Sequence, residues 1–412
     1  MPRSFYLLLV IQFVSTLADN AFLIVTIARV IELAASDWVI PALKLSFTLF
    51  YVLLAPFVGP LADAFPKGRV MLMANLIKMC AVLLLLAGLD PTVAIGLAGI
   101  GAAIYAPAKY GLITEYLPPE SLVKANGFFE GATVCAVIIG TALGGFLISP
   151  LMSVSNVPDG LFLLSSTSTL LIPGMLAILG LNILATLLSF GMADSGARYP
   201  VHAFQSGVLI KCFFKENWIL WRDPLGGLSM AVTTLLWGVG ATLQLIVLRW
   251  AHELLGLSLT QATYLQVVTA VGVVLGAILA SRRMTLAKTS GLLPMGMVLG
   301  VLISAMLLVK TIFVACVLLV LVGGVAGYFV VPMNALLQHR GCSLLTAGRS
   351  IAVQGFNENA GMLLMLGIYA TAVATQASLD SLILCFSALI VLGIASIWIS
   401  QQKVNSLQRL RP

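Results

Sequence analysis

Charge is scarce in this sequence. Asp, Glu, Lys and Arg together make up 9% of the 412 residues, whereas hydrophobic residues make up 60%. A soluble domain carries roughly 25% charged residues to solvate its surface. A chain so poor in charge cannot cover itself in water, which excludes an ordinary soluble enzyme and predicts a protein that lies mostly in lipid.

Residues for metal, thiol or nucleotide chemistry are also few. The three histidines fall at expected loops or interfaces, and the six cysteines lie mostly inside apolar runs without a Cys-x-x-Cys pair. We therefore expect the cysteines to be small buried hydrophobes, and we expect no metal site, no cofactor and no Ser-His chemistry. No Gly-Lys-Ser/Thr follows a glycine-rich turn, which disfavours ATP-driven transport. These absences predict a protein that is not an enzyme.

The net charge of +7 raises the question of nucleic acid. The basic residues are scattered through short loops between apolar runs, however, and form no patch interleaved with aromatic residues. No nucleic-acid partner is therefore expected.

Long apolar runs dominate what is present. Charge-free stretches of 18 or more residues occupy 45–62, 91–108, 131–158, 160–193, 224–248, 254–281, 289–309, 311–338, 359–379 and 381–402. Each is close to the roughly 20 residues that cross a bilayer as a helix, or longer. Two further helices, near 5–31 and 70–89, tolerate internal charge. The sequence thus predicts an all-α membrane protein with 12 transmembrane helices.

Lys and Arg are distributed unevenly between the two sets of loops. If both termini are cytoplasmic, sixteen of the 22 Lys and Arg residues fall on the cytoplasmic side, and the opposite loops keep few. Cytoplasmic loops of membrane proteins carry such an excess. We therefore predict that both termini are cytoplasmic.

The longest polar connection, 193–224, divides the chain into an N-terminal six-helix half (1–192) and a C-terminal six-helix half (225–412). Its mixture of basic and aromatic residues predicts an amphipathic helix that lies on anionic lipid. Residues 105–130 are faintly echoed by 331–358, a repeat that places helices 4 and 5 opposite helices 10 and 11. Repeated halves with substrate near their interface are typical of secondary transporters.

Charged residues inside predicted helices are candidates for the substrate site. Asp19 and Asn20 fall in the middle of helix 1, where a carboxylate is costly unless it faces a cavity or a partner. Lys78 in helix 3 and Lys109 in helix 4 are its candidate cationic partners. The alternatives are that Asp19 only packs helix 1 against a Lys, and that Lys109 only extends its charge to the membrane interface.

Polar side chains also gather in the later helices. Glu130 and Glu358 occupy matching places in the repeat, and Glu358 is flanked by Gln354, Asn357 and Asn359. Facing lipid, these side chains would leave hydrogen-bonding groups unsatisfied, so we expect them to line a cavity or to lock helix 11 against a neighbour. Gln244 adds a polar group to helix 7.

A motif joins helices 2 and 3. Gly59, Asp63, Lys67, Gly68 and Arg69 occur in the order of the major facilitator signature G-x-L-x-D-x-x-G-R, with a longer turn between the Asp and the Gly. The Asp is expected to cap or salt-bridge a neighbouring helix end, and the basic pair to fix topology and gating. A charged turn without such a role is the alternative.

Further matches are dispersed along the chain. They are Gln12-Phe13 to Asp19-Asn20-Ala21, Ala55-Pro56-Phe57-Val58-Gly59 through Ala62-Asp63 to Lys67-Gly68-Arg69-Val70, Pro107-Ala108-Lys109-Tyr110-Gly111, Leu122-Val123-Lys124-Ala125-Asn126-Gly127, Phe329-Val330-Val331-Pro332 to Asn334-Ala335-Leu336-Leu337-Gln338, and Met362-Leu363-Leu364-Met365-Leu366-Gly367-Ile368-Tyr369. With them the chain resembles the bacterial lysophospholipid transporter family of the major facilitator superfamily over nearly its whole length.

The resemblance implies a specific activity. A protein of this family would flip lysophosphatidylethanolamine and related lysolipids from the outer to the inner leaflet of the bacterial inner membrane. There a cytoplasmic acyltransferase/acyl-carrier-protein synthetase would re-acylate them. The partners implied are thus the lysophospholipid, membrane lipid and that enzyme, and a monomer is expected. Relatives treat the residues at the positions of Asp19 and Lys109 as functional.

One position departs from the family. Relatives carry a cation after the Thr-Leu of helix 7, where this chain has Gln244. This departure argues against a salt bridge from Asp19 to helix 7. Asp19 with Lys78 or Lys109 can still supply both charges that a zwitterionic headgroup needs. The alternative function is a proton-coupled exporter of drugs or small amphiphiles, with Asp19 or Glu130 as the proton carrier. A membrane-embedded acyltransferase would need a catalytic His or Asp motif, which the sequence does not offer.

Overall fold

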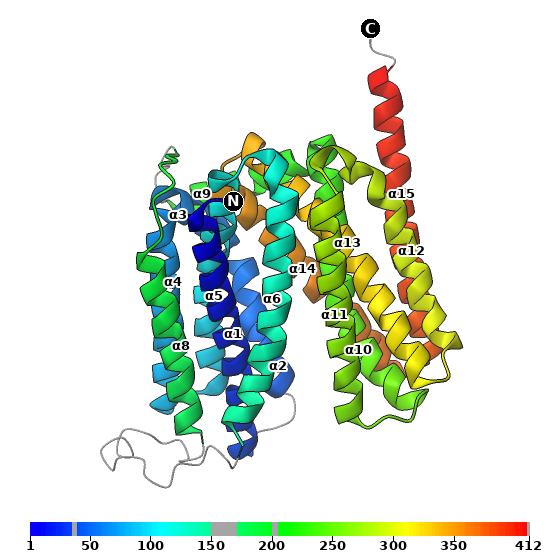
Figure 1. The fold of residues 1–412 in the computed structure, drawn as a ribbon, viewed down its shortest axis with the longest axis horizontal. Helices are drawn as coiled ribbons and strands as arrows, with labels where there is room; N and C mark the ends of the chain where they lie inside the picture. Colours follow the sequence, from blue (N-terminus) through cyan, green and yellow to red (C-terminus); the bar gives the residue numbers. More distant parts are fainter. Residues whose placement is uncertain (35–38, 150–170, 200–204, 410–412) are drawn as a thin grey trace. The chain divides into compact units, whose positions relative to one another are not determined.

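A computed structural model describes residues 1–34, 39–149, 171–199 and 205–409. The described residues form helices and no strands (Figure 1). His202 and the predicted junction of the fifth and sixth spans, near 158–160, lie outside the described residues. The α-helices are α1 (Arg3–Glu32), α2 (Val39–Leu53), α3 (Ala55–Ala64), α4 (Lys67–Leu86), α5 (Pro91–Tyr116), α6 (Pro119–Leu147), α8 (Ile172–Phe190), α9 (Ser206–Arg222), α10 (Pro224–Glu253), α11 (Leu259–Arg283), α12 (Leu293–Ser304), α13 (Ile312–Leu344), α14 (Ala347–Ala374) and α15 (Leu379–Arg409).

The predicted spans correspond to these helices. Ten helical segments of the described chain are long and apolar enough to cross a membrane, and the number rises to eleven if the pair α2 and α3, bent by 62°, is counted as one span. Helix α14 is more polar, but its 28 residues are about 42 Å long at 1.5 Å per residue, more than the hydrocarbon core of about 30 Å. Counting α14 gives twelve spans. The all-α membrane fold is confirmed.

Helix starts follow from local chemistry. Asp90 caps α5 by accepting hydrogen bonds from the N–H groups of Thr92 and Val93, at 2.8 and 3.2 Å, and Pro91 occupies the first helical position. Asp223 caps α10 through Gly226 in the same way. Such residues satisfy the N–H groups that the first turn leaves without partners.

Contacts within the chain divide it into two compact units, and neither is one continuous segment. The first contains residues 1–117, 132–214 and 345–355, and the second contains 118–131, 215–344 and 356–412. Three helices therefore begin in one unit and continue in the other: α6 begins in the second, whereas α9 and α14 begin in the first. Glu130 lies on α6 and Glu358 lies on α14.

Glycines set the packing of α11 against α13 in the second unit. A Cβ placed on Gly276 would lie 2.0 Å from the carbonyl oxygen of Gly324, and one on Gly272 would lie 2.4 Å from that of Val320. Gly323 and Gly327 of α13 approach α11 equally closely. Gly272 and Gly276, which are four residues apart on α11, thus allow close contact between the two helices.

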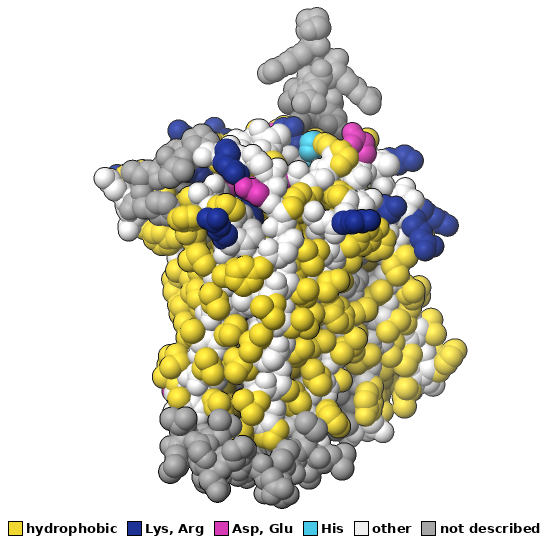
Figure 2. Space-filling model, turned by 60° about the vertical axis from the view of Figure 1, so that its left-hand side comes forward, with side chains coloured by type: hydrophobic (Ala, Val, Ile, Leu, Met, Phe, Trp, Pro, Cys, Tyr) yellow, Lys and Arg dark blue, Asp and Glu magenta, His cyan; other side chains and the backbone are white. Residues whose placement is uncertain are grey.

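The outer surface of the helices is apolar. Hydrophobic side chains cover the middle of the face in Figure 2, and Lys and Arg gather at one end of it. One expectation from the sequence is wrong here: none of the six cysteines is buried, and Cys80 and Cys385 are exposed. The reason is that an apolar run in a membrane helix places side chains towards lipid as well as towards the core.

Candidate functional site

Asp19 and Lys78 form an ion pair between α1 and α4. The Lys78 Nζ lies 2.6 Å from Asp19 Oδ2, and the exposed fractions of the two side chains are 3% for Lys78 and 20% for Asp19. Both residues are far from the ends of their helices. The structure therefore pairs Asp19 with Lys78, one of the two candidate cations that the sequence left open.

A chain of hydrogen bonds holds Lys78 from its other side. Its ammonium donates to Ser15 Oγ at 3.0 Å, Ser15 donates to Asn75 Oδ1 at 3.3 Å, and Asn75 donates to Ser189 of α8 at 3.4 Å. Lys78, Ser15, Asn75 and Ser189 are all buried. A buried charge is tolerated when its hydrogen-bonding capacity is used in this way.

Lys109 of α5 lies near the ion pair, because Lys109 and Lys78 both lie close to the aromatic ring of Tyr105. The Nζ atoms of Lys78 and Lys109 lie 5.1 and 5.5 Å from the ring centroid of Tyr105, and Lys109 also lies 4.5 Å from that of Tyr110. Aromatic faces attract cations at such distances. Two cations and one carboxylate are thus gathered among α1, α4 and α5.

Asn20, the other candidate of helix 1, is directed elsewhere. Its amide donates to the backbone carbonyl of Thr16, one turn earlier in α1, at 2.8 Å. Its Cβ lies against α6, where a Cβ on Gly140 would approach it within 3.1 Å. The geometry gives Asn20 a place in the contact between α1 and α6.

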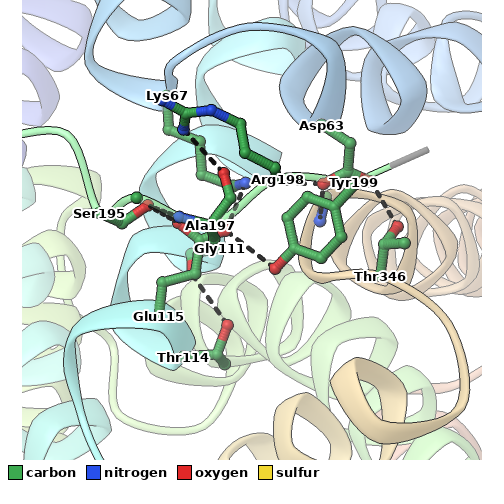
Figure 3. A network of polar contacts seen from close by, with 12 residues as sticks. Asp63, Lys67, Gly111, Thr114, Glu115, Ser195, Ala197, Arg198, Tyr199 and Thr346 are labelled. Atoms are coloured by element: carbon green, nitrogen blue, oxygen red, sulfur yellow. Dashed lines mark hydrogen bonds and ion pairs between the residues drawn. The ribbon is translucent and has the colours of Figure 1, made fainter. Parts of the chain in front are cut away.

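A second charged cluster lies at the turn between α3 and α4. Lys67 lies 2.5 Å from Glu115 and 3.5 Å from Asp63, and all three side chains are no more than 5% exposed (Figure 3). Glu115 stands at the end of α5, and the sequence reasoning did not single it out. The spacing of Lys67 and Glu115 in the sequence does not indicate that the two residues form an ion pair.

Asp63 joins this cluster to the start of α14. Its carboxylate accepts hydrogen bonds from the backbone N–H groups of Gly348 and Arg349, at 2.9 and 3.3 Å, and from the hydroxyl of Thr346. It therefore caps α14 from another helix, where the positive end of the helix dipole favours a carboxylate. Gly59 permits this approach, because a Cβ there would lie 2.8 Å from the Cα of Arg349.

The segment after α8 completes the cluster. Ser195 donates to Glu115 at 2.5 Å, Tyr199 donates to Glu115 at 3.0 Å, and the ring of Tyr199 lies 4.8 Å from Lys67 Nζ (Figure 3). Hydrogen bonds from Arg198 and from the N–H of Gly196 lower the pKa of exposed Asp194 to about 2. The start of the predicted linker is thus fixed to α4 and α5.

The basic pair of the motif is divided. Lys67 is buried in the cluster, whereas Arg69 is exposed. Gly68 lies between them and faces the end of α8, where a Cβ would lie 3.1 Å from the Cβ of Met192. The sequence predicted one role for both cations. In the structure the Lys67 side chain is buried and the Arg69 side chain is exposed, so the two lie in different environments.

The remaining candidates belong to the second unit. Gln244 is exposed on α10, and its backbone carbonyl accepts a hydrogen bond from Gln266 at 3.2 Å. Asn357 donates to Asn217 of α9 at 2.7 Å. Glu130 on α6 and Glu358 on α14 are half-buried. Asn357 is therefore part of the contact between α14 and the linker helix.

Other polar contacts of the second unit escaped the sequence reasoning. Asn126 of α6 and Gln338 of α13, both buried, exchange two amide hydrogen bonds at 2.8 and 3.0 Å. Asp223 accepts two hydrogen bonds from Arg340. Burial alone would raise the pKa of Asp223, but hydrogen bonds from Arg340 and from the N–H groups of the helix start outweigh it and hold that pKa below its ordinary value.

Comparison with known proteins connects these features to a family. Residues 8–365 match the Major Facilitator Superfamily. A protein named Lysophospholipid transporter LplT from Serratia proteamaculans is 36% identical over 407 residues, covering 98% of this chain and 97% of its own. The protein of that name from Salmonella arizonae is 38% identical over 401 residues, covering 96% and 95%. The chain belongs to the lysophospholipid transporter family of the Major Facilitator Superfamily.

Solved structures agree with this family at the level of fold. A bacterial homologue of the iron transporter ferroportin in an outward-facing state has a TM-score of 0.71 at 16% identity, covering 98% of this chain and 100% of that one. The transporter FucP in the outward conformation also gives 0.71, at 13% identity and 97% coverage of both chains. At such identities the likeness concerns the fold alone.

Proposed function

We propose that this family member transports lysophospholipids, which it moves from the outer to the inner leaflet of the bacterial inner membrane. The observation that carries the proposal is the Asp19–Lys78 pair, held among apolar helices in a chain 36–38% identical to proteins named lysophospholipid transporters. Charges inside membrane helices generally mark a substrate or ion pathway.

The chemistry of the substrate matches these charges. A lysophosphatidylethanolamine headgroup carries a phosphate, which needs a cation, and an ammonium, which needs a carboxylate. Lys109, whose Nζ lies 5.5 and 4.5 Å from the ring centroids of Tyr105 and Tyr110, is the cation that we assign to the phosphate, because charge-assisted hydrogen bonds to phosphate are strong. Asp19 is the more exposed member of its pair and is the group for the ammonium.

Lys78 stays in place when Asp19 exchanges its ion pair with Lys78 for one with the substrate ammonium. Its bond to Ser15 and its position over Tyr105 keep its charge satisfied while Asp19 turns towards the substrate. We assign binding to Asp19, Lys78 and Lys109. Asn20, Glu130, Gln244, Asn357 and Glu358 remain proposed lining residues.

We assign gating to the motif cluster. Asp63 holds the start of α14, and Lys67 links Asp63 to Glu115. Breaking the Asp63 contacts would release α14 from α3, as one helix must leave another when a transporter changes its accessible side. Gly59 and Gly68 allow the close packing, and exposed Arg69 favours the cytoplasmic side.

The cellular setting follows from the same proposal. The halves 1–192 and 225–412 are joined by the linker 193–224, both termini are cytoplasmic, and the protein acts as a monomer. Lysolipid delivered to the inner leaflet would there meet a cytoplasmic acyltransferase/acyl-carrier-protein synthetase.

The test is uptake of labelled lysophosphatidylethanolamine by vesicles that contain the purified protein. Asp19→Asn and Lys109→Gln should each lower the initial rate at least tenfold, because each removes one charge that the headgroup needs. Glu253→Gln is the matched control, since it breaks another carboxylate ion pair, with Arg249, at the exposed end of α10. It should leave the rate unchanged.

Two results would contradict the proposal. Equal rates for wild type and Asp19→Asn would remove Asp19 from the site. Export of a cationic amphiphile that stops when the proton gradient is collapsed, without any lysolipid uptake, would instead support a proton-coupled exporter.

A further inference from the structure

Helix α9 carries two different stripes. Leu209, Phe213 and Leu220 are buried against the protein at 3%, 3% and 0% exposure. Lys211, Lys215, Trp218 and Arg222 are all exposed. At 3.6 residues per turn these four lie within an arc of about 60°, opposite the buried stripe. The helix therefore needs its apolar face for packing and still presents an organised second face.

The chemistry of this second face is basic and aromatic. Arg222 lies over the ring of Trp218, 4.5 Å from its centroid, and Phe214 beside it is 55% exposed. Glu216, the acidic residue of the helix, lies on the side of the buried stripe by the same periodicity. The face thus offers three cations and a large amphipathic ring without an acid among them.

The helix is held in place independently of this face. Asn217 accepts a hydrogen bond from Asn357 of α14 at 2.7 Å, and Trp221 donates to Asn357 at 3.0 Å. An exposed stripe on a helix fixed in this way is oriented before any ligand arrives. Little ordering of the backbone is then needed for binding.

We propose that this α9 face, made of Lys211, Lys215, Trp218 and Arg222, binds the headgroups of anionic phospholipids at the membrane surface. Tryptophan rings favour the level of the headgroups, and Lys and Arg side chains near an anionic leaflet are attracted to its surface charge. The surface recognises bulk anionic lipid and is separate from the residues assigned to transport.

The experiment places the full chain in bilayer discs of phosphatidylcholine and phosphatidylglycerol at equal mole fractions. In one sample the phosphatidylcholine is brominated near the headgroup, and in the other the phosphatidylglycerol is. The fluorescence of Trp218 is obtained by subtracting the fluorescence of the Trp218→Phe variant from that of the wild type, and its quenching by each brominated lipid is measured. Wild type should show several-fold more quenching from brominated phosphatidylglycerol. The variant Lys211→Gln/Lys215→Gln/Arg222→Gln should show equal quenching from both lipids.

The matched control removes three exposed cations elsewhere, Arg282→Gln/Arg283→Gln/Lys288→Gln, and should keep the wild-type preference. Equal quenching in wild type would overturn the proposal, as would a control that loses the preference. Absence of quenching by either lipid would also overturn it, because the face would then meet water or a protein. The readout does not depend on transport, so failure of the proposed function would leave it standing.

Discussion

At the scale of single residues, the protein satisfies its buried cations in two ways. Lys78 has one carboxylate, one hydroxyl and one aromatic face, whereas Lys67 has two carboxylates and an aromatic face. Removing one partner of a buried pair leaves the other charge unpaired, which costs about 3–5 kcal/mol. Replacing both partners avoids most of that cost.

The Asp19–Lys78 pair provides the corresponding prediction. Lys78→Met should lower the free energy of unfolding by about 3 kcal/mol, because it leaves the Asp19 carboxylate without its cation. The double variant Asp19→Asn/Lys78→Met should recover most of the loss. Thermal unfolding in detergent checks this, and a double variant as unstable as the sum of the single ones would refute it. Transport should remain low in both, since folding and binding need the pair for different reasons.

At the scale of helices, contacts between backbones set the geometry. In the described chain α11 and α13 meet through glycines on both sides, and α14 begins where Asp63 and Gly59 of α3 hold it. An added side chain at such a contact cannot be accommodated by moving another side chain, because the opposing atoms belong to the main chain. Substitutions there should act through packing.

Gly276 and Gly240 form a matched pair for this idea. A Cβ on Gly276 would meet the Gly324 carbonyl at 2.0 Å, whereas one on Gly240 of α10 would meet no atom within 4 Å. Gly276→Ala should destabilise the protein by about 1–3 kcal/mol through overpacking. Gly240→Ala should stabilise it by roughly 0.5–1 kcal/mol through helix propensity. Thermal unfolding should show opposite signs, and equal shifts would contradict the close contact.

At the scale of the whole molecule, the relevant features are the distribution of charge and the division of the chain into two units. The first turns of α6 belong with the second unit, and those of α14 with the first. The two helices occupy matching places in the sequence repeat. The proposed pair of related halves would account for the matching places of these two helices.

The proposed orientation can be measured directly. In a variant without the native cysteines, a cysteine at Gln376, in the turn between α14 and α15, should react with an impermeant maleimide added to intact cells. A cysteine at Thr285, which follows α11, should react only after permeabilisation, because its loop carries Arg282, Arg283 and Lys288. Both positions are exposed. The reverse pattern would place the termini outside.

The fold class and the family could both be predicted from the amino-acid sequence. Apolar runs identify membrane-spanning helices without any knowledge of tertiary structure. The reason is that burying a charge in lipid is costly for each helix separately. The motif order from Gly59 to Arg69 and the dispersed matches gave the family in the same way. The same reasoning failed for the cysteines, since a run of apolar residues does not show which side faces lipid.

Tertiary structure alone decided the partners. Asp19 takes Lys78, 59 residues away, and Lys67 takes Glu115, while Arg69 points outward. Such choices depend on how α1, α4 and α5 pack, and no periodicity within one helix encodes them. The linker shows both contributions: its sequence indicated an amphipathic helix, but only the folded chain separates the stripe of α9 that packs on the protein from the basic and aromatic stripe that faces away.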